Sequence, residues 1–212
     1  MKIIEADFDR RIDLPGVGPC PRPVDIDQAV SGFADLVSLR IYAFPAGETI
    51  HGDAEEDELF IVLLRGRAKV AIDHGGTEVA SFAMNADGGT RAAFLPPDAS
   101  YRLTTETATD VAYARTRPAS GWQVMPAGFA TTAGRLSVPD HARGMAIDLV
   151  PLARGETLTV PTGVERLVHA AMGNITVAGA EVGEWQNAAL APGDTGPIVA
   201  SASADVLLVT AR

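Results

Sequence analysis

The stretch Gly47-Glu48-Thr49-Ile50 recurs in the second half of the chain as Gly155-Glu156-Thr157-Leu158. Each copy follows a short segment of the β-forming type, 39–44 in one case and 146–152 in the other. A glycine-led turn that follows a strand twice in one chain indicates a duplicated structural unit.

Three further pairs of matching residues follow these turns in the same order. Glu58 lies eight residues before Gly66, and Glu165 lies eight residues before Gly173. The other two pairs are Leu95-Pro96-Pro97-Asp98 with Leu190-Ala191-Pro192-Gly193, and Asp110-Val111 with Asp205-Val206. A common order of four matches predicts two copies of one small fold.

The local pattern within each copy is that of antiparallel strands. Short runs with alternating apolar residues are separated by turn residues such as 74–76 and 87–89. The 21 Gly and 14 Pro among 212 residues agree with an all-β chain that is rich in turns. We expect an N-terminal arm at 1–35, a first barrel at 36–116, a linker at 117–144 with a strand near 122–125, and a second barrel at 145–212.

The run Leu59 to Leu64 is apolar at every position, which is unusual for a strand with one face in water. Both faces of this strand are therefore expected to be covered. One face would line the first barrel, and the other would pack on the sister barrel or on another subunit.

Composition excludes several classes of partner. The net charge of -10 opposes binding to phosphate backbones, so nucleic acid is not expected as a partner. The longest apolar run, Leu59 to Leu64, is too short to cross a bilayer, and residues 1–13 lack the apolar core of a signal peptide. The single cysteine, Cys20, has no partner for an internal disulfide, which agrees with a cytoplasmic location.

Three segments of the first copy, 45–51, 58–66 and 95–101, resemble the two short motifs of the cupin superfamily. Residues 36–116 are similar to the first half of the bicupin 5-deoxy-glucuronate isomerases of inositol catabolism. The resemblance implies an all-β fold of two tandem cupin-type antiparallel β-barrels, each a double-stranded β-helix. It also implies a small-molecule ligand of the sugar-acid type.

The metal site of this superfamily is incomplete in both copies. Metal-binding cupins use three histidines and a glutamate around an open site. Here the expected histidine pair reads His51-Gly52-Asp53, and Tyr101 stands in the place of the third histidine. In the second copy, Glu165 alone remains. We therefore predict no cofactor; a divalent ion of zinc, iron, manganese or nickel, if bound, would use His51, Asp53 and Glu58.

His51, Glu58 and Tyr101 are the candidate catalytic residues. Glu58 would act as a base beside a carbonyl carbon, and His51 or Tyr101 would act as the acid. Arg40 and Arg102 are candidates for binding an anionic ligand through bidentate hydrogen bonds. A shift of one residue in the strand register would turn Glu58 to the opposite face, and Tyr101 could simply fill the barrel.

Three functions are compatible with these residues. The first is a small-molecule binding protein or sugar-acid isomerase-like enzyme with a degenerate metal site in the N-terminal barrel. The second is a non-catalytic bicupin that serves as a binding or oligomerisation module, and we expect a homodimer from the apolar strand faces. The third is a metal-dependent oxygenase that holds iron with His51, Asp53, Glu58 and Tyr101.

Overall fold

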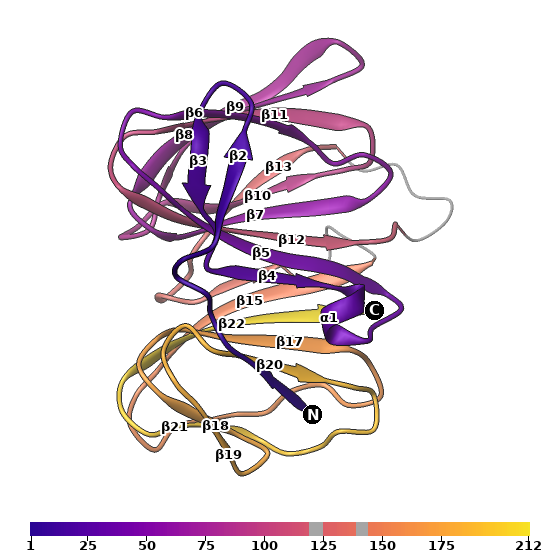
Figure 1. Ribbon diagram of the computed structural model, residues 1–212, viewed down its shortest axis with the longest axis vertical. Coiled ribbons are helices and arrows are strands. Elements are labelled where there is room, and N and C mark those ends of the chain that lie inside the picture. The colour runs from indigo at the N-terminus through magenta and orange to yellow at the C-terminus, as the bar shows by residue number, and fades with distance from the viewer. Residues whose placement is uncertain (119–124, 139–143) are drawn as a thin grey trace.

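The computed structural model describes residues 1–118, 125–138 and 144–212. Two antiparallel β-barrels lie one above the other, the first in purple and magenta and the second in orange and yellow (Figure 1). The strand predicted near 122–125 lies, except for its last residue, outside the described residues.

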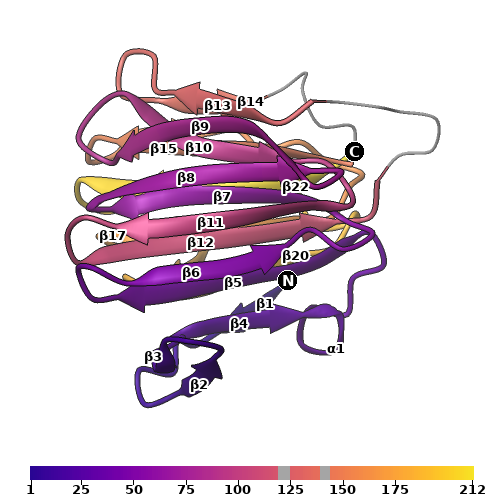
Figure 2. The same cartoon turned by 90° about the horizontal axis from the view of Figure 1, so that it is seen from above.

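The first barrel consists of a six-stranded sheet in the order β13-β10-β7-β12-β5-β4 and a four-stranded sheet in the order β6-β11-β8-β9. Figure 2 shows these strands running nearly side by side across the barrel. The strands are β4 (Val24–Asp27), β5 (Leu36–Phe44), β6 (Thr49–Asp53), β7 (Glu58–Arg65), β8 (Arg67–His74), β9 (Thr77–Asn85), β10 (Thr90–Leu95), β11 (Ala99–Thr105), β12 (Thr109–Thr116) and β13 (Ala127–Ala130).

The second barrel repeats this plan with sheets in the orders β1-β20-β17-β22-β15-β14 and β16-β21-β18-β19. Its strands are β1 (Lys2–Ile4), β14 (Leu136–Val138), β15 (Met145–Leu152), β16 (Thr157–Leu158), β17 (Arg166–Met172), β18 (Ile175–Val177), β19 (Ala180–Val182), β20 (Asn187–Leu190), β21 (Ile198–Ala200) and β22 (Ala204–Ala211). A hairpin of β2 (Arg11–Leu14) and β3 (Gly18–Pro21) and the short helix α1 (Gln28–Ser31) complete the described elements. No described helix is long and apolar enough to cross a membrane.

The glycines that mark the repeat sit where a side chain has no room. Gly66 follows β7 with φ +87°, and a Cβ there would lie 2.3 Å from the backbone oxygen of Ala108. Gly173 follows β17 with φ +71°, and a Cβ would lie 2.3 Å from the backbone oxygen of Ser203. Both turns therefore need glycine for the same steric reason.

The apolar strand β7 is covered on both faces, as its sequence predicts. Leu59, Ile61 and Leu63 face the interior of the first barrel. Phe60 and Val62 belong instead to a cluster that joins the two six-stranded sheets. The outer cover of β7 is therefore the sister barrel, and the two barrels share one apolar interface.

Residues outside the two repeats extend both large sheets. From the expected arm, β1 pairs with β20 of the second barrel, while β4 pairs with β5 of the first. From the expected linker, β13 pairs with β10 and β14 pairs with β15. These added strands cover sheet edges that would otherwise expose unpaired backbone groups.

Candidate ligand-binding cavity

Polar side chains line one end of the first barrel's interior. On β5, Ser38, Arg40 and Tyr42 alternate with residues that pack between the barrels, and on β12 Tyr113 and Arg115 hold the corresponding positions. Together with Tyr101 of β11 and His51 of β6, they border a cavity of about 90 Å³. This volume has room for about three water molecules.

Three tyrosines form the wall of this cavity. The Tyr113 ring lies 5.5 Å from that of Tyr42 at an angle of 87°, and 5.8 Å from that of Tyr101. Burial raises the pKa of Tyr101 to about 12 and that of Tyr113 well above its usual value. The two phenols are close enough to interact electrostatically, but the Tyr113 hydroxyl has no hydrogen-bond partner among the described residues. Both are therefore neutral hydrogen-bond donors at physiological pH.

Arginines give one side of the cavity a positive charge. Arg40 lies 3.3 Å from Asp25, and the same carboxylate also meets Arg22 at 2.7 Å and Arg10 at 3.8 Å. Arg10 also lies 3.8 Å from Asp7, so two carboxylates face three guanidinium groups and one positive charge remains beside Arg40. Arg115 donates to the backbone oxygens of 53 and 54, and its Nη1 lies 3.1 Å from Glu55 and 3.6 Å from Asp57, so these carboxylates neutralise its charge.

His51 reaches this cavity only from its rim. It is directly opposite Arg102 in the pairing of β6 with β11, so both side chains lie on the outer face of the sheet. His51 is exposed, and Arg102 lies 3.9 Å from Glu78, away from the cavity. Gly52 is opposite Tyr101, and a Cβ there would lie 2.6 Å from the phenol oxygen, so this glycine makes room for the tyrosine.

Glu58 is on the opposite face of β7 from the cavity. Alternation along the strand places it with Phe60 and Val62 at the interface between barrels, where it is 1% exposed. Its carboxylate accepts a hydrogen bond from the backbone N–H of Gly144 at 3.0 Å. Leu59 is the inward-facing residue at the start of the strand. The structure thus does not bring Glu58 together with Tyr101 and His51.

The residues do not form the metal site of other cupins. No three His, Cys, Asp or Glu side chains in the described parts of the chain lie close enough together to hold an ion. His51 and Asp53 are exposed on β6, Glu58 faces the other barrel, and the interior positions nearby carry Leu59 and Tyr101. The donor set therefore does not fit a cupin metal.

The second barrel has no equivalent of the tyrosine wall. Counted from the shared repeat residues, Val150, Leu208 and Gly196 take the places of Tyr42, Tyr113 and Tyr101. Val150 and Leu208 belong to the apolar core of that barrel. Its one large buried cation, Arg166, donates to the backbone oxygens of 161, 191 and 194.

Ser38, Tyr42, Tyr113 and Arg115 are the polar cavity residues that sequence reasoning missed. Polar residues at 38, 40 and 42, and again at 113 and 115, interrupt apolar strands with a period of two. That period places polar side chains on a single face of each strand and could have indicated a polar interior.

The stacked barrels and their shared plan give the chain a bicupin fold, with two cupin-type β-barrels in one chain. Residues 22–127, half of the chain, match the KduI/IolB family, and the protein belongs to that family. No curated protein matches the sequence.

Solved structures with the same fold cover nearly the whole chain. Bacterial pirin YhhW from Escherichia coli, in complex with nickel(II), has 14% identity and a TM-score of 0.69 over 100% of this chain and 99% of its own. An IolB-like protein from Salmonella typhimurium has 17% identity and a TM-score of 0.69 over 90% and 89%. Oxalate decarboxylase from Bacillus subtilis has 10% identity and a TM-score of 0.69 over 99% and 76%. At these identities the likeness establishes the fold alone.

Proposed function

We propose that this protein binds a small carboxylated molecule of the sugar-acid type in the cavity of its first barrel. The observation that supports this most is the wall of neutral phenols beside Arg40, which shares its carboxylate partner Asp25 with two other arginines. The second barrel has no tyrosines at the corresponding positions. Phenol O–H groups donate to carbonyl and hydroxyl oxygens, and a guanidinium group binds a carboxylate.

The cavity volume of about 90 Å³ suits one end of such a molecule rather than the whole of it. The carboxylate would meet Arg40, whose side chain is 39% exposed at the side of the cavity. Tyr101 and Tyr113 would donate to the oxygens that enter the cavity. The remaining hydroxyl groups would lie at the rim, near His51.

Calorimetric titration with glucuronate and galacturonate, and with glucose as the uncharged comparison, tests this proposal. We expect both acids to bind. Arg40→Gln and Tyr113→Phe should each lower the affinity for these acids about tenfold, the usual effect of one lost charged or buried hydrogen bond. Arg102→Gln is the matched control, because Arg102 is also exposed beside one acidic residue but does not line the cavity. Absence of binding, or equal effects of Arg40→Gln and Arg102→Gln, would contradict the proposal.

Membership of the KduI/IolB family favours a second candidate, an isomerase that moves a proton between carbons next to a carbonyl. In this case Tyr101 and Tyr113 would donate to the carbonyl oxygen, and His51 would exchange the proton at the rim. The reaction carried out in D₂O would place deuterium on the carbon beside the carbonyl, visible by NMR, and His51→Gln would abolish the exchange. Binding without deuterium exchange would leave the protein as a non-catalytic binding module.

A further inference from the structure

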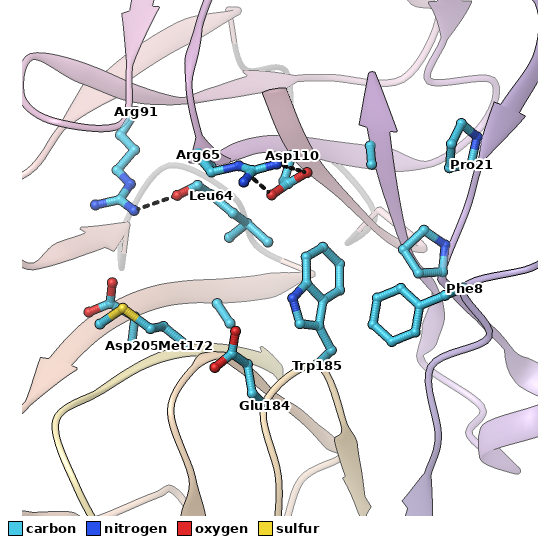
Figure 3. A pocket seen from close by; sticks show the side chains of 13 residues that line it. Phe8, Pro21, Leu64, Arg65, Arg91, Asp110, Met172, Glu184, Trp185 and Asp205 are labelled. Atoms are coloured by element: carbon cyan, nitrogen blue, oxygen red, sulfur yellow. Dashed lines mark hydrogen bonds and ion pairs between the residues drawn. The ribbon is translucent and has the colours of Figure 1, made fainter. Parts of the chain in front are cut away.

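A larger cavity lies between the two barrels, outside the site proposed above. Its volume is about 560 Å³, within the range of sites that hold small molecules, and junctions between domains are common places for such sites. Both barrels supply its walls, with Arg65, Arg91 and Asp110 from the first and Met172, Trp185 and Asp205 from the second (Figure 3).

One end of this cavity is aromatic. The Phe8 ring meets the Trp185 indole edge-on at 5.7 Å (Figure 3), and Pro21 and Pro23 also line the cavity. Phe8 is 60% exposed and Met172 is 46% exposed, so two of the five large exposed apolar side chains of the described residues border this cavity. Trp185 also has φ +69°, a left-handed conformation that strains a bulky residue. An exposed apolar surface with backbone strain is typical of a binding site.

The other end of the cavity carries two carboxylates that are equivalent in the repeat, and only one of them has an arginine as its register partner. Asp110 of the first barrel is paired in register with Arg65 and forms an ion pair with it at 2.9 Å. Asp205 occupies the same position in the second barrel, but its register partner is Met172. The carboxylate of Asp205 therefore lacks the arginine that neutralises its counterpart.

Arg91 faces Asp205 across the cavity (Figure 3). Its Nε donates to the backbone oxygen of Leu63 at 2.9 Å, and its Nη2 donates to that of Leu64 at 3.0 Å. These bonds hold the guanidinium in place, and its charge interacts with those of Asp205 and Asp87. Among the described residues, no ion pair joins Arg91 to Asp205. A cation held by two hydrogen bonds and an anion thus lie on two sides of one space.

We propose that the cavity between the barrels binds a small zwitterion with an aromatic ring, of the class of the aromatic α-amino acids. The ligand's carboxylate meets Arg91, its ammonium group meets Asp205, and its ring packs against Trp185 and Phe8. Glu184, exposed at the same wall, adds negative charge on the ammonium side. Each part of the ligand thus corresponds to one feature of the cavity: the carboxylate to Arg91, the ammonium group to Asp205 and the ring to the aromatic end.

Calorimetric titration with L-phenylalanine tests the proposal, with three fragments of it for comparison. Phenylacetate lacks the ammonium group, phenethylamine lacks the carboxylate, and glycine lacks the ring. We expect L-phenylalanine to bind at least about tenfold more tightly than any of the three, because each fragment loses one charged hydrogen bond or the apolar contact.

Asp205→Asn keeps the shape of the side chain and removes its charge. We expect it to weaken the binding of L-phenylalanine about tenfold and to leave the binding of phenylacetate unchanged, since phenylacetate has no ammonium group. Phe8→Ala should weaken the binding of all the ring-bearing ligands. Tyr113→Phe, in the other cavity, should change the binding of none of them. Circular dichroism and the unfolding midpoint of each variant check that it folds.

Three outcomes would overturn the proposal. The first is that L-phenylalanine does not bind at millimolar concentration, and the second is that Asp205→Asn affects L-phenylalanine and phenylacetate equally. The third is a dimer in sedimentation experiments that Phe8→Glu dissociates, because the cavity would then be an interface between two copies of this chain.

Discussion

The carboxylate of Glu165 accepts a hydrogen bond from the backbone N–H of Leu36 at 3.0 Å, so the second barrel holds the start of the first barrel's β5. The backbone N–H groups of Ala34 and Asp35 donate to the same carboxylate at 2.6 and 2.9 Å. The repeat partner of Glu165, Glu58, accepts from Gly144, the residue before β15. Each repeated glutamate therefore binds the backbone at the start of the first strand of the opposite repeat, β5 or β15.

We expect Glu165→Ala to lower the free energy of unfolding by about 3 kcal/mol, because it leaves backbone N–H groups without an acceptor at a buried carboxylate. Chemical denaturation measures this loss. Glu156→Ala is the matched control, since Glu156 also accepts a backbone N–H, from Ala153, but at an exposed position, and we expect less than about 1 kcal/mol there. Equal losses for the two variants would show that the contact between barrels does not stabilise the fold.

Gly66→Ala should destabilise the protein by about 3 kcal/mol or more, because its Cβ would overlap a backbone oxygen in a left-handed turn. Gly75→Ala provides the comparison, since Gly75 has φ +63° but nothing within 4 Å of its Cβ position. Only the conformational cost of about 1 kcal/mol applies there. Thermal unfolding of both variants measures the difference, and similar unfolding midpoints would disprove the steric explanation.

The buried His169 should make the stability of the fold sensitive to acid. It is fully buried with Nδ1 3.0 Å from the Asn187 side-chain oxygen, and burial lowers its pKa from 6.5 to about 4. The unfolded chain takes up a proton below pH 6.5 while the folded chain does not, so the stability present above pH 6.5 is lost as the pH falls towards 4. The loss is roughly 3 kcal/mol.

Denaturation of His169→Gln at pH 7 and pH 4.5 should show a smaller loss of stability than the wild type shows. His74→Gln, at an exposed histidine, should retain the wild-type loss. If His169→Gln lost as much stability between pH 7 and pH 4.5 as the wild type, His169 would not be the source of the acid sensitivity.

The buried Tyr101 should make the stability of the fold sensitive to alkali. Burial raises its pKa to about 12, so between pH 10 and 12 the unfolded chain releases this proton while the folded chain keeps it. Stability that is intact below pH 10 then falls by roughly 3 kcal/mol as the pH rises to 12. We expect Tyr101→Phe to flatten this decline in urea denaturation at pH 9 and pH 11; a decline as steep as that of the wild type would refute the prediction.

The candidate site was only partly predictable because the decisive strand has no alternation. Because both faces of β7 carry apolar residues, the sequence did not indicate whether Glu58 points into the barrel or away from it. The pairing of β7 with β10 and β12 places Glu58 at the interface between the barrels. His51 was identified by its place after the Gly47 turn, but its pairing with Arg102 turns it outward. The homodimer and the cytoplasmic location stay predictions.

The amino-acid sequence by itself determined the duplication and the β-barrel class, because the repeated glycine turns and the period of two are local properties of the chain. The face on which each polar side chain lies depends on register between strands far apart in the sequence. Tertiary structure alone therefore decided that Tyr42, Tyr101 and Tyr113 meet in one cavity. It also decided that Asp110 and Asp205, equivalent in the repeat, meet at one cavity between the barrels, where only Asp110 has an arginine as its register partner.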